Sequence, residues 1–146
     1  MIVGYTTGVF DLFHIGHLRL LRRAKEECDK LIVGVTKDEL VSYKYKKAVI
    51  SFEERIEIIR SIRYVDEAVP QVSMDKMTAW EKLKFNIMFV GDDWKGTEKW
   101  NNYEIDFEKV GVVINYFPYT EGTSSTLINE LLIFERDKLI HGGKND

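Results

Sequence analysis

Short apolar runs alternate with longer amphipathic stretches along the 146 residues of the chain. The apolar runs are rich in β-branched and aromatic residues, which predicts strands. Five such strands are expected, at residues 2–6, 31–35, 65–69, 87–90 and 112–117. Between them, apolar residues recur at helical spacing beside charged ones, which predicts helices with one buried face. Alternating strands and helices are typical of a parallel sheet covered by helices.

Local signals place the helices and the turns. Ser51-Phe-Glu-Glu54 reads as a capping box, so a helix is expected to begin there and to run through Ile62. Pro70 and Pro118 are expected to end the third and fifth strands, and Gly111 to follow a helix as its C′ residue. The remaining helices are predicted near residues 18–28, 75–84, 97–110 and 124–140.

These elements predict an α/β fold of the Rossmann-like type, with an open, mostly parallel five-stranded sheet and helices on both faces. The chain has no internal repeat and no stretch rich in Pro, Gly and Ser, so residues 1–146 are expected to form one domain. Residues 140–146 are expected to be a frayed tail. Ligands are expected beyond the carboxyl ends of the strands.

Composition narrows the class of protein. With 45% hydrophobic and 31% charged residues, the chain is an ordinary globular one. A formal net charge of −3 gives no overall attraction to nucleic acid or to an anionic membrane, so neither is an expected partner. Cys28 is the only cysteine, which excludes an internal disulfide. With no basic leader and no apolar run of ~20 residues, we expect a soluble cytoplasmic protein.

The segment from Thr6 to His17 directly follows the first predicted strand. Gly8 permits a tight turn, and His14 and His17 are three residues apart, so both imidazoles lie on one face if a helix begins here. A helix amino end has free N–H groups and favours phosphate. The sequence therefore predicts a polyphosphate site at this turn.

Other interpretations of the histidines carry less weight. A zinc site would need a third ligand, and His14 and His17 lack the spacing and the intervening glutamate of zincins. His141 lies near the tail and is expected to be a surface residue. The chain contains neither a Walker A motif nor G-x-G-x-x-G, so phosphate must be bound in another way.

Four ordered blocks carry a resemblance to a known family. They are G-V-F-D-L-F-H-I-G-H at 8–17, R-Y-V-D-E at 63–67, G-D-D-W-K-G at 91–96 and T-E-G-T-S-S-T at 120–126. The first resembles the H-x-G-H signature of the nucleotidyltransferase superfamily. Together, over residues 2–132, they resemble its glycerol-3-phosphate cytidylyltransferase branch.

The resemblance implies transfer of CMP from CTP to a phospho-alcohol, with glycerol 3-phosphate as the favoured acceptor and CDP-glycerol and pyrophosphate as products. It implies direct in-line attack, Mg²⁺ bound with CTP, and a homodimer. Alternatives stay open: another acceptor such as phosphocholine, phosphoethanolamine, a polyol phosphate or a phosphonate; adenylyl transfer on the same fold; and a nucleotide-binding module without catalysis.

The resemblance also assigns roles to residues. The implied catalytic residues are His14, His17, Lys44, Lys46 and Arg63, and the acceptor is assigned to Lys44 and Lys76. The implied nucleotide-binding residues are Thr7, Gly8, Val9, Phe10, Gly16, Arg55, Asp92, Asp93, Trp94, Tyr119, Thr120, Glu121, Gly122, Thr123, Ser124, Ser125 and Thr126.

Several of these residues could instead have a purely structural role. A planar guanidinium can hold two phosphate oxygens, but Arg55 could instead pair with Glu54 or Glu57 along its helix. The lysines at 44–47 could be a solvated loop, residues 92–94 an acidic turn, and the hydroxyls at 123–125 a helix N-cap.

The chain departs from the family at Tyr119, where the family has an arginine near the triphosphate. Residues 97–109 are an insertion relative to its shortest members. Lys99, Trp100 or Tyr103 from this insertion could compensate for the missing cation.

Overall fold

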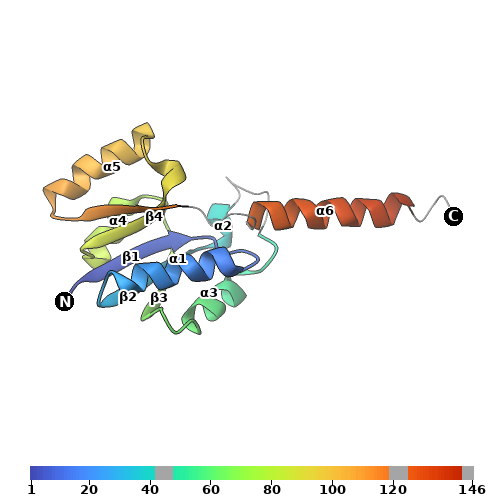
Figure 1. Cartoon of the computed structure of the whole chain (residues 1–146), viewed down its shortest axis with the longest axis horizontal. Helices are drawn as coiled ribbons and strands as arrows, with labels where there is room; N and C mark the ends of the chain where they lie inside the picture. Colours follow the sequence, from blue (N-terminus) through green and yellow to red (C-terminus); the bar gives the residue numbers. More distant parts are fainter. Residues whose placement is uncertain (42–47, 119–124, 143–146) are drawn as a thin grey trace.

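Five parallel strands form one sheet in the order β3-β2-β1-β4-β5 (Figure 1). The computed structural model describes residues 1–41, 48–118 and 125–142. Every ladder between neighbouring strands is parallel, which confirms the predicted α/β fold. The strands are β1 (Val3–Gly8), β2 (Lys30–Thr36), β3 (Glu67–Gln71), β4 (Ile87–Gly91) and β5 (Val113–Phe117).

Helices cover both faces of this sheet, as the sequence predicts. On one face, α1 (Ile15–Glu26) and α3 (Phe52–Arg60) bury Leu21, Ala24, Ile56 and Ile59 against β2, β4 and β5. On the other face, α4 (Lys76–Leu83) and α5 (Glu98–Lys109) pack in a second apolar cluster with residues of β1, β2 and β4. Two short helices, α2 (Asp38–Val41) and the 3₁₀ helix η1 (Asp92–Trp94), were not expected.

The third strand differs from its predicted bounds. Pro70 lies inside β3, opposite Val35 of β2, and does not end the strand. A proline has no N–H to give to a ladder, but β3 has a neighbour on one side only in the described sheet, and edge strands tolerate proline.

Strand order reverses between β1 and β4. From β1 the chain adds β2 and β3 on one side, and it then crosses to add β4 and β5 on the other. Ligands of open α/β sheets bind at such a switch point, beyond the carboxyl ends of the strands. The loop from β1 to α1 and the helix η1 after β4 both lie at this edge.

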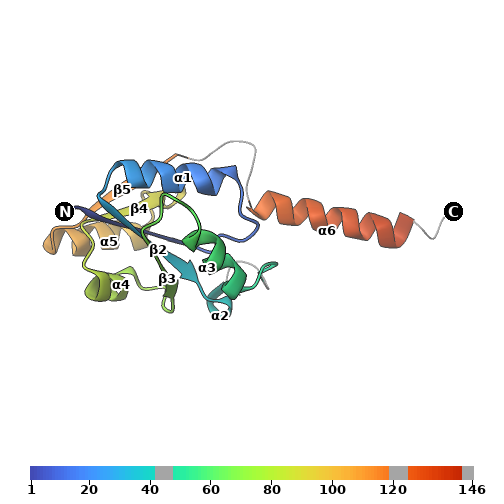
Figure 2. The same ribbon diagram turned by 90° about the horizontal axis from the view of Figure 1, so that it is seen from below.

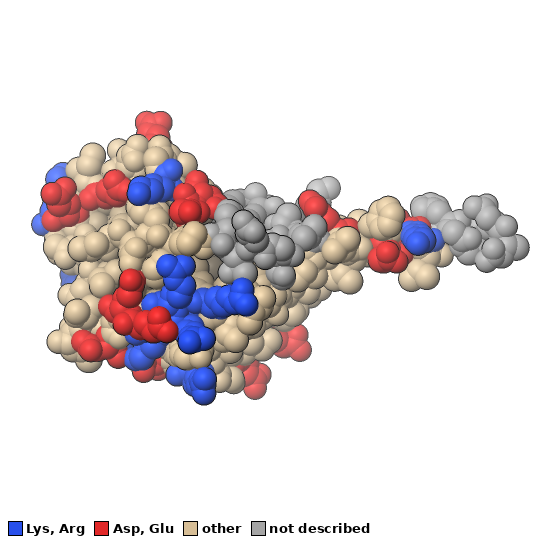
Figure 3. Space-filling view, in the orientation of Figure 1, with Lys and Arg blue, Asp and Glu red and all other residues tan. Residues whose placement is uncertain are grey.

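The last helix, α6 (Ser125–Gly142), projects from the domain (Figures 1 and 2). It continues through residues 140–142, which were expected to belong to the tail; residues 143–146 lie outside the described part. Both views place its amino end beside the amino end of α1. Few charged side chains appear along it in Figure 3, whereas Lys and Arg gather over α1. Among the described residues, no helix combines the length and the apolar character needed to cross a membrane.

Candidate functional site

His14 and His17 cap the amino end of α1 reciprocally. The His14 Nδ1 atom accepts a hydrogen bond from the Gly16 backbone N–H at 3.0 Å. The His17 Nδ1 atom accepts one from the His14 backbone N–H at 3.2 Å. The two rings stack with their centroids 3.9 Å apart, and Phe10 meets the His17 ring edge-on. A helix does begin at these residues, so the condition for a shared face of both histidines is met.

These contacts fix what the two rings can offer to a ligand. Because each Nδ1 accepts a hydrogen bond, a neutral ring must carry its proton on Nε2, which is then the donor. Burial lowers the pKa of His14 below its usual value of 6.5, which favours the neutral ring. The edge of the sheet thus presents imidazole donors at a helix amino end, where the dipole also favours an anion.

The loop that carries the histidines is held in an unusual conformation. Phe10 and Leu12 have positive φ values of 55° and 50°, a left-handed backbone that costs a non-glycine residue about 1–2 kcal/mol. The Phe10 ring also lies so close to Gly8 that an added Cβ there would come within 3.2 Å of it. The loop therefore needs support from elsewhere in the protein.

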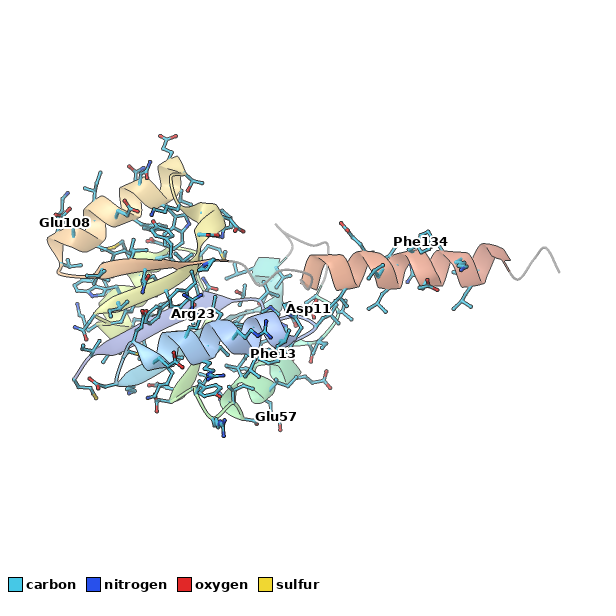
Figure 4. All side chains as sticks on the ribbon, viewed as in Figure 1. Asp11, Phe13, Arg23, Glu57, Glu108 and Phe134 are labelled. Carbon is cyan, nitrogen blue, oxygen red and sulfur yellow. The ribbon has the colours of Figure 1, made fainter. Side chains whose placement is uncertain are left out.

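Asp11 supplies part of that support, although sequence reasoning did not select it. Its side chain is only 4% exposed and lies in the loop between β1 and α1 (Figure 4). The carboxylate accepts backbone N–H bonds from Leu12 (3.1 Å), Val49 (2.8 Å) and Ile50 (2.9 Å). Asp11 thereby ties the segment that precedes α3 to the histidine loop. In the sequence, the signal that could have identified Asp11 is a carboxylate within an otherwise apolar run.

Arg55 differs from its expected role as a phosphate clamp. The side chain is fully buried and donates to the carbonyls of Val9 (2.7 Å), Thr36 (2.8 Å) and Ile50 (2.9 Å). Its Nη2 atom also donates to Asp38 Oδ1 at 2.7 Å. The acidic partner of Arg55 is thus Asp38, and not Glu54 or Glu57 along α3 as the alternative interpretation expects. Protein oxygens therefore already accept the hydrogen bonds of this guanidinium, which joins three chain segments at the edge of the sheet.

A polar contact joins the carboxyl ends of β1, β2 and β3. The hydroxyls of Thr7 and Thr36 both donate to Gln71 Oε1, and the Thr36 bond is 2.7 Å long. Thr36 and Gln71 are buried. Thr7, expected at the nucleotide, therefore helps to hold the three strand ends together.

Lys76, expected at the acceptor, opens α4 after β3 and is only 6% exposed. Burial, together with the nearby charge of Lys99, lowers the pKa of Lys76 to about 8. Asp75 opposes this shift through its negative charge. A negative charge near Lys76 would favour the charged form of its ammonium.

The other described candidate site residues lie at opposite edges of the sheet. Asp92, Asp93 and Trp94 form η1 and are exposed at the carboxyl end of β4, next to β1 in the sheet. Arg63 lies between α3 and β3 at the amino edge of the sheet, where it donates to the Tyr64 hydroxyl at 3.2 Å. That edge is about 17–20 Å from the histidine edge, the length of one strand. The structure does not bring Arg63 to His14 and His17 within this chain.

Several predicted site residues lie outside the described part of the chain. These are Lys44, Lys46, Tyr119, Thr120, Glu121, Gly122, Thr123 and Ser124. Ser125 and Thr126 open α6, but their side chains are not described.

Known proteins are similar in sequence to this chain over most of its length. The profile of the Cytidylyltransferase-like family matches residues 5–131. The chain is 40% identical over 132 residues to the glycerol-3-phosphate cytidylyltransferase of Bacillus subtilis strain 168, covering 86% of this chain and 92% of that protein. Its identity to the Staphylococcus aureus protein of the same name is 39% over 128 residues, with 87% and 92% covered. An FAD synthase of Archaeoglobus fulgidus is 35% identical over 99 residues, with 68% and 72% covered.

Solved structures agree with the fold. A lipopolysaccharide core biosynthesis protein of Thermoplasma volcanium superposes with a TM-score of 0.70 at 27% identity, covering 84% of this chain and 99% of that one. A pantoate-beta-alanine ligase of Francisella tularensis, at 16% identity, shares the fold alone, with a TM-score of 0.65 and coverage of 88% and 65%. Since the family profile spans nearly the whole described domain, including the paired histidines at the switch point, this chain belongs to the cytidylyltransferase-like family.

Proposed function

We propose that the protein transfers CMP from CTP to glycerol 3-phosphate, giving CDP-glycerol and pyrophosphate. The observation that carries the proposal is the reciprocal cap of His14 and His17 at the switch point of the sheet. It sets imidazole donors at a helix amino end, which suits a triphosphate. The 40% identity to glycerol-3-phosphate cytidylyltransferase over most of both chains supports the choice of acceptor.

The reaction is a direct displacement. A phosphate oxygen of the acceptor attacks the α-phosphorus of CTP, and the bond from that phosphorus to the bridging oxygen breaks as pyrophosphate leaves. Both partners are anionic, so the protein acts mainly by aligning them and by stabilising charge on the phosphoryl oxygens. In this proposal the Nε2–H groups of His14 and His17 donate to those oxygens, and Lys44 and Lys46 add positive charge.

Mg²⁺ is proposed to bind together with CTP. This ion prefers oxygen ligands and is commonly held by one or two carboxylates and the phosphates of a substrate. Asp92 and Asp93, which are exposed after β4, are carboxylates of the required kind at the same edge of the sheet. When bound, the ion would neutralise part of the charge on the phosphates.

We further propose that the protein works in the cytoplasm as a homodimer. The single cysteine, Cys28, suits a reducing compartment. The dimer follows from the family resemblance, and sedimentation of the full chain would test it.

A pyrophosphate-release assay tests the activity. CTP or ATP is combined with glycerol 3-phosphate, phosphocholine, phosphoethanolamine and a polyol phosphate, and product formation is followed. We expect turnover with CTP and glycerol 3-phosphate, and a ~10²–10³-fold loss in His17→Ala, the usual cost of one lost donor. Nucleotide binding without turnover would identify a binding module, and wild-type turnover in His17→Ala would refute the catalytic role of this ring.

Adenylyl transfer is a second candidate, because the chain resembles an FAD synthase over 99 residues. The same assay with ATP and flavin mononucleotide separates this candidate from the first. Turnover with that pair, and none with CTP, would replace cytidylyl by adenylyl transfer.

A further inference from the structure

The helix α6 exposes an apolar surface that no other part of the described chain covers. Every residue from 130 to 140 is exposed, and both views show this part of the helix standing clear of the domain (Figures 1 and 2). Large apolar side chains contribute much of this surface, with exposed fractions from 49% at Ile133 to 78% at Leu139. They are Leu131, Leu132, Ile133, Phe134, Leu139 and Ile140. Large contiguous apolar patches of this kind mark interaction surfaces.

Four of these side chains share one broad face of α6. Phe134 follows Leu131 by three residues, and Leu139 follows Leu132 by seven, which are the spacings of a helix face that packs on another helix. Ile133 lies on the opposite face. A helix of this length is marginal in water by itself, and helices in proteins owe most of their stability to the packing of such a face. A partner on this face would supply that packing.

The charges beside this face indicate what the partner is. Glu130 lies four residues before Phe134 and Lys138 four residues after it, so the three side chains form one row along the helix. Neither charge has an ion pair within the part of the chain that the structure describes. If two copies of α6 pack antiparallel and cross at Phe134, Glu130 of each copy comes opposite Lys138 of the other. Parallel packing would instead set like charges opposite each other.

A lipid surface fits α6 less well than a second copy does. Helices that lie on anionic membranes carry an excess of Lys and Arg on their polar face. Residues 130–140 carry more acidic than basic side chains, namely Glu130, Glu135 and Asp137 against Arg136 and Lys138. An anionic surface would therefore not attract this helix, whereas a second copy presents both signs of charge.

The exposed area is large enough for a helix pair. Burying the exposed parts of Leu131, Leu132, Phe134 and Leu139 would remove about 300 Å² of apolar surface from each copy. Since apolar atoms make up about 65% of a homodimer interface, the two copies together would bury about 900 Å². This lies close to the lower limit of about 1,000 Å² for a specific interface. The association is therefore expected to depend on protein concentration.

We propose that two copies of this chain associate by antiparallel packing of α6 on α6, with Phe134 at the crossing point and Glu130 opposite Lys138 of the other copy. A self-complementary patch of this kind gives a closed pair with twofold symmetry. The inference does not rest on the proposed reaction, and it gives the proposed homodimer a defined surface.

Sedimentation equilibrium of the full chain over a range of concentrations tests the pairing. The wild type should reach twice the mass of Leu131→Glu, in which each copy brings a charge into the apolar contact and association weakens on the order of 100-fold. Ile133→Glu is the matched control, because it introduces the same charge at a similarly exposed apolar residue on the opposite face, and it should keep the wild-type mass. Far-UV circular dichroism checks that each variant keeps its folded domain.

Exchanging the two charges tests the antiparallel order. Glu130→Lys or Lys138→Glu alone sets like charges opposite each other at both ends of the contact and should weaken association roughly tenfold. The double variant restores opposite charges and should associate within about twofold of the wild type. The two positions are about 12 Å apart along one helix, so a contact within a single copy does not explain this recovery.

The outcomes separate this inference from its alternatives. Equal masses for the wild type and Leu131→Glu would overturn it, and so would an equal loss of association in Ile133→Glu. A double charge variant that stays as weak as the single ones would overturn the antiparallel arrangement. Binding of the wild type to phosphatidylserine vesicles without a change of mass in solution would identify a lipid surface as the partner instead. CMP transfer is measured separately by pyrophosphate release, so either proposal can fail while the other stands.

Discussion

Replacing Arg55 by Met tests whether this side chain is a structural link or a phosphate clamp. The substitution removes three hydrogen bonds to the carbonyls of Val9, Thr36 and Ile50 and one to Asp38, all between 2.7 and 2.9 Å. Removing one member of a buried charged network typically costs about 3–5 kcal/mol. A domain of this size is stable by about 5–15 kcal/mol. We therefore expect a large loss, on the order of 10 °C in Tm.

The measurement is urea unfolding followed by circular dichroism, with Arg60→Met as the matched control, since Arg60 is exposed at the end of the same helix. The control should change the free energy of unfolding by less than about 0.5 kcal/mol. Arg55→Lys should be intermediate, because an ammonium is a point donor and cannot span three carbonyls. A loss below about 1 kcal/mol in Arg55→Met, together with weakened CTP binding, would refute the structural role and restore the phosphate clamp.

Three further substitutions probe the same edge of the sheet. Asp11→Asn sets an amide N–H against the backbone donors of Val49 and Ile50, so we expect a loss of ~1–3 kcal/mol in urea unfolding and slower pyrophosphate release; wild-type values of both would contradict this. Burial lowers the pKa of His14, so the unfolded state takes up its proton first and stability should fall as pH drops below about 6.5. Thermal unfolding of His14→Gln between pH 5 and 7.5 should show a shallower fall, and equal slopes would count against the buried neutral ring. In Gly34→Ala the new Cβ would overlap the hydroxyl of Tyr5, which is 1% exposed, so we expect a loss of ~1–3 kcal/mol; an unchanged Tm would show that the ring can move aside.

Local sequence signals predicted much of the fold because they act over a few residues. Each of the five predicted strands is present, since its apolar run needs only to be buried in a sheet. Ser51 accepts the Glu54 N–H, which is one half of the predicted capping box. The histidine cap of α1 also joins residues only two or three positions apart, so the H-x-G-H spacing was enough to predict a shared face.

Contacts between distant segments lie beyond such signals. Arg55 reaches Val9 across 46 positions, and Asp11 reaches Val49 across 38. A charged residue in a sequence looks like a surface or ligand-binding residue until its buried partners are known. This is why Arg55 was assigned to phosphate and Asp11 was not selected.

The sequence by itself determined the order of the elements, the α/β class and the turn that carries His14 and His17, because each depends on local periodicity, capping and spacing. The tertiary structure alone decided that Arg55 links loops, that Pro70 lies inside an edge strand and that Lys76 is buried at the start of α4. Those outcomes depend on which segments the sheet and its crossovers bring together, and burial and charge pairing exist only once that packing is in place.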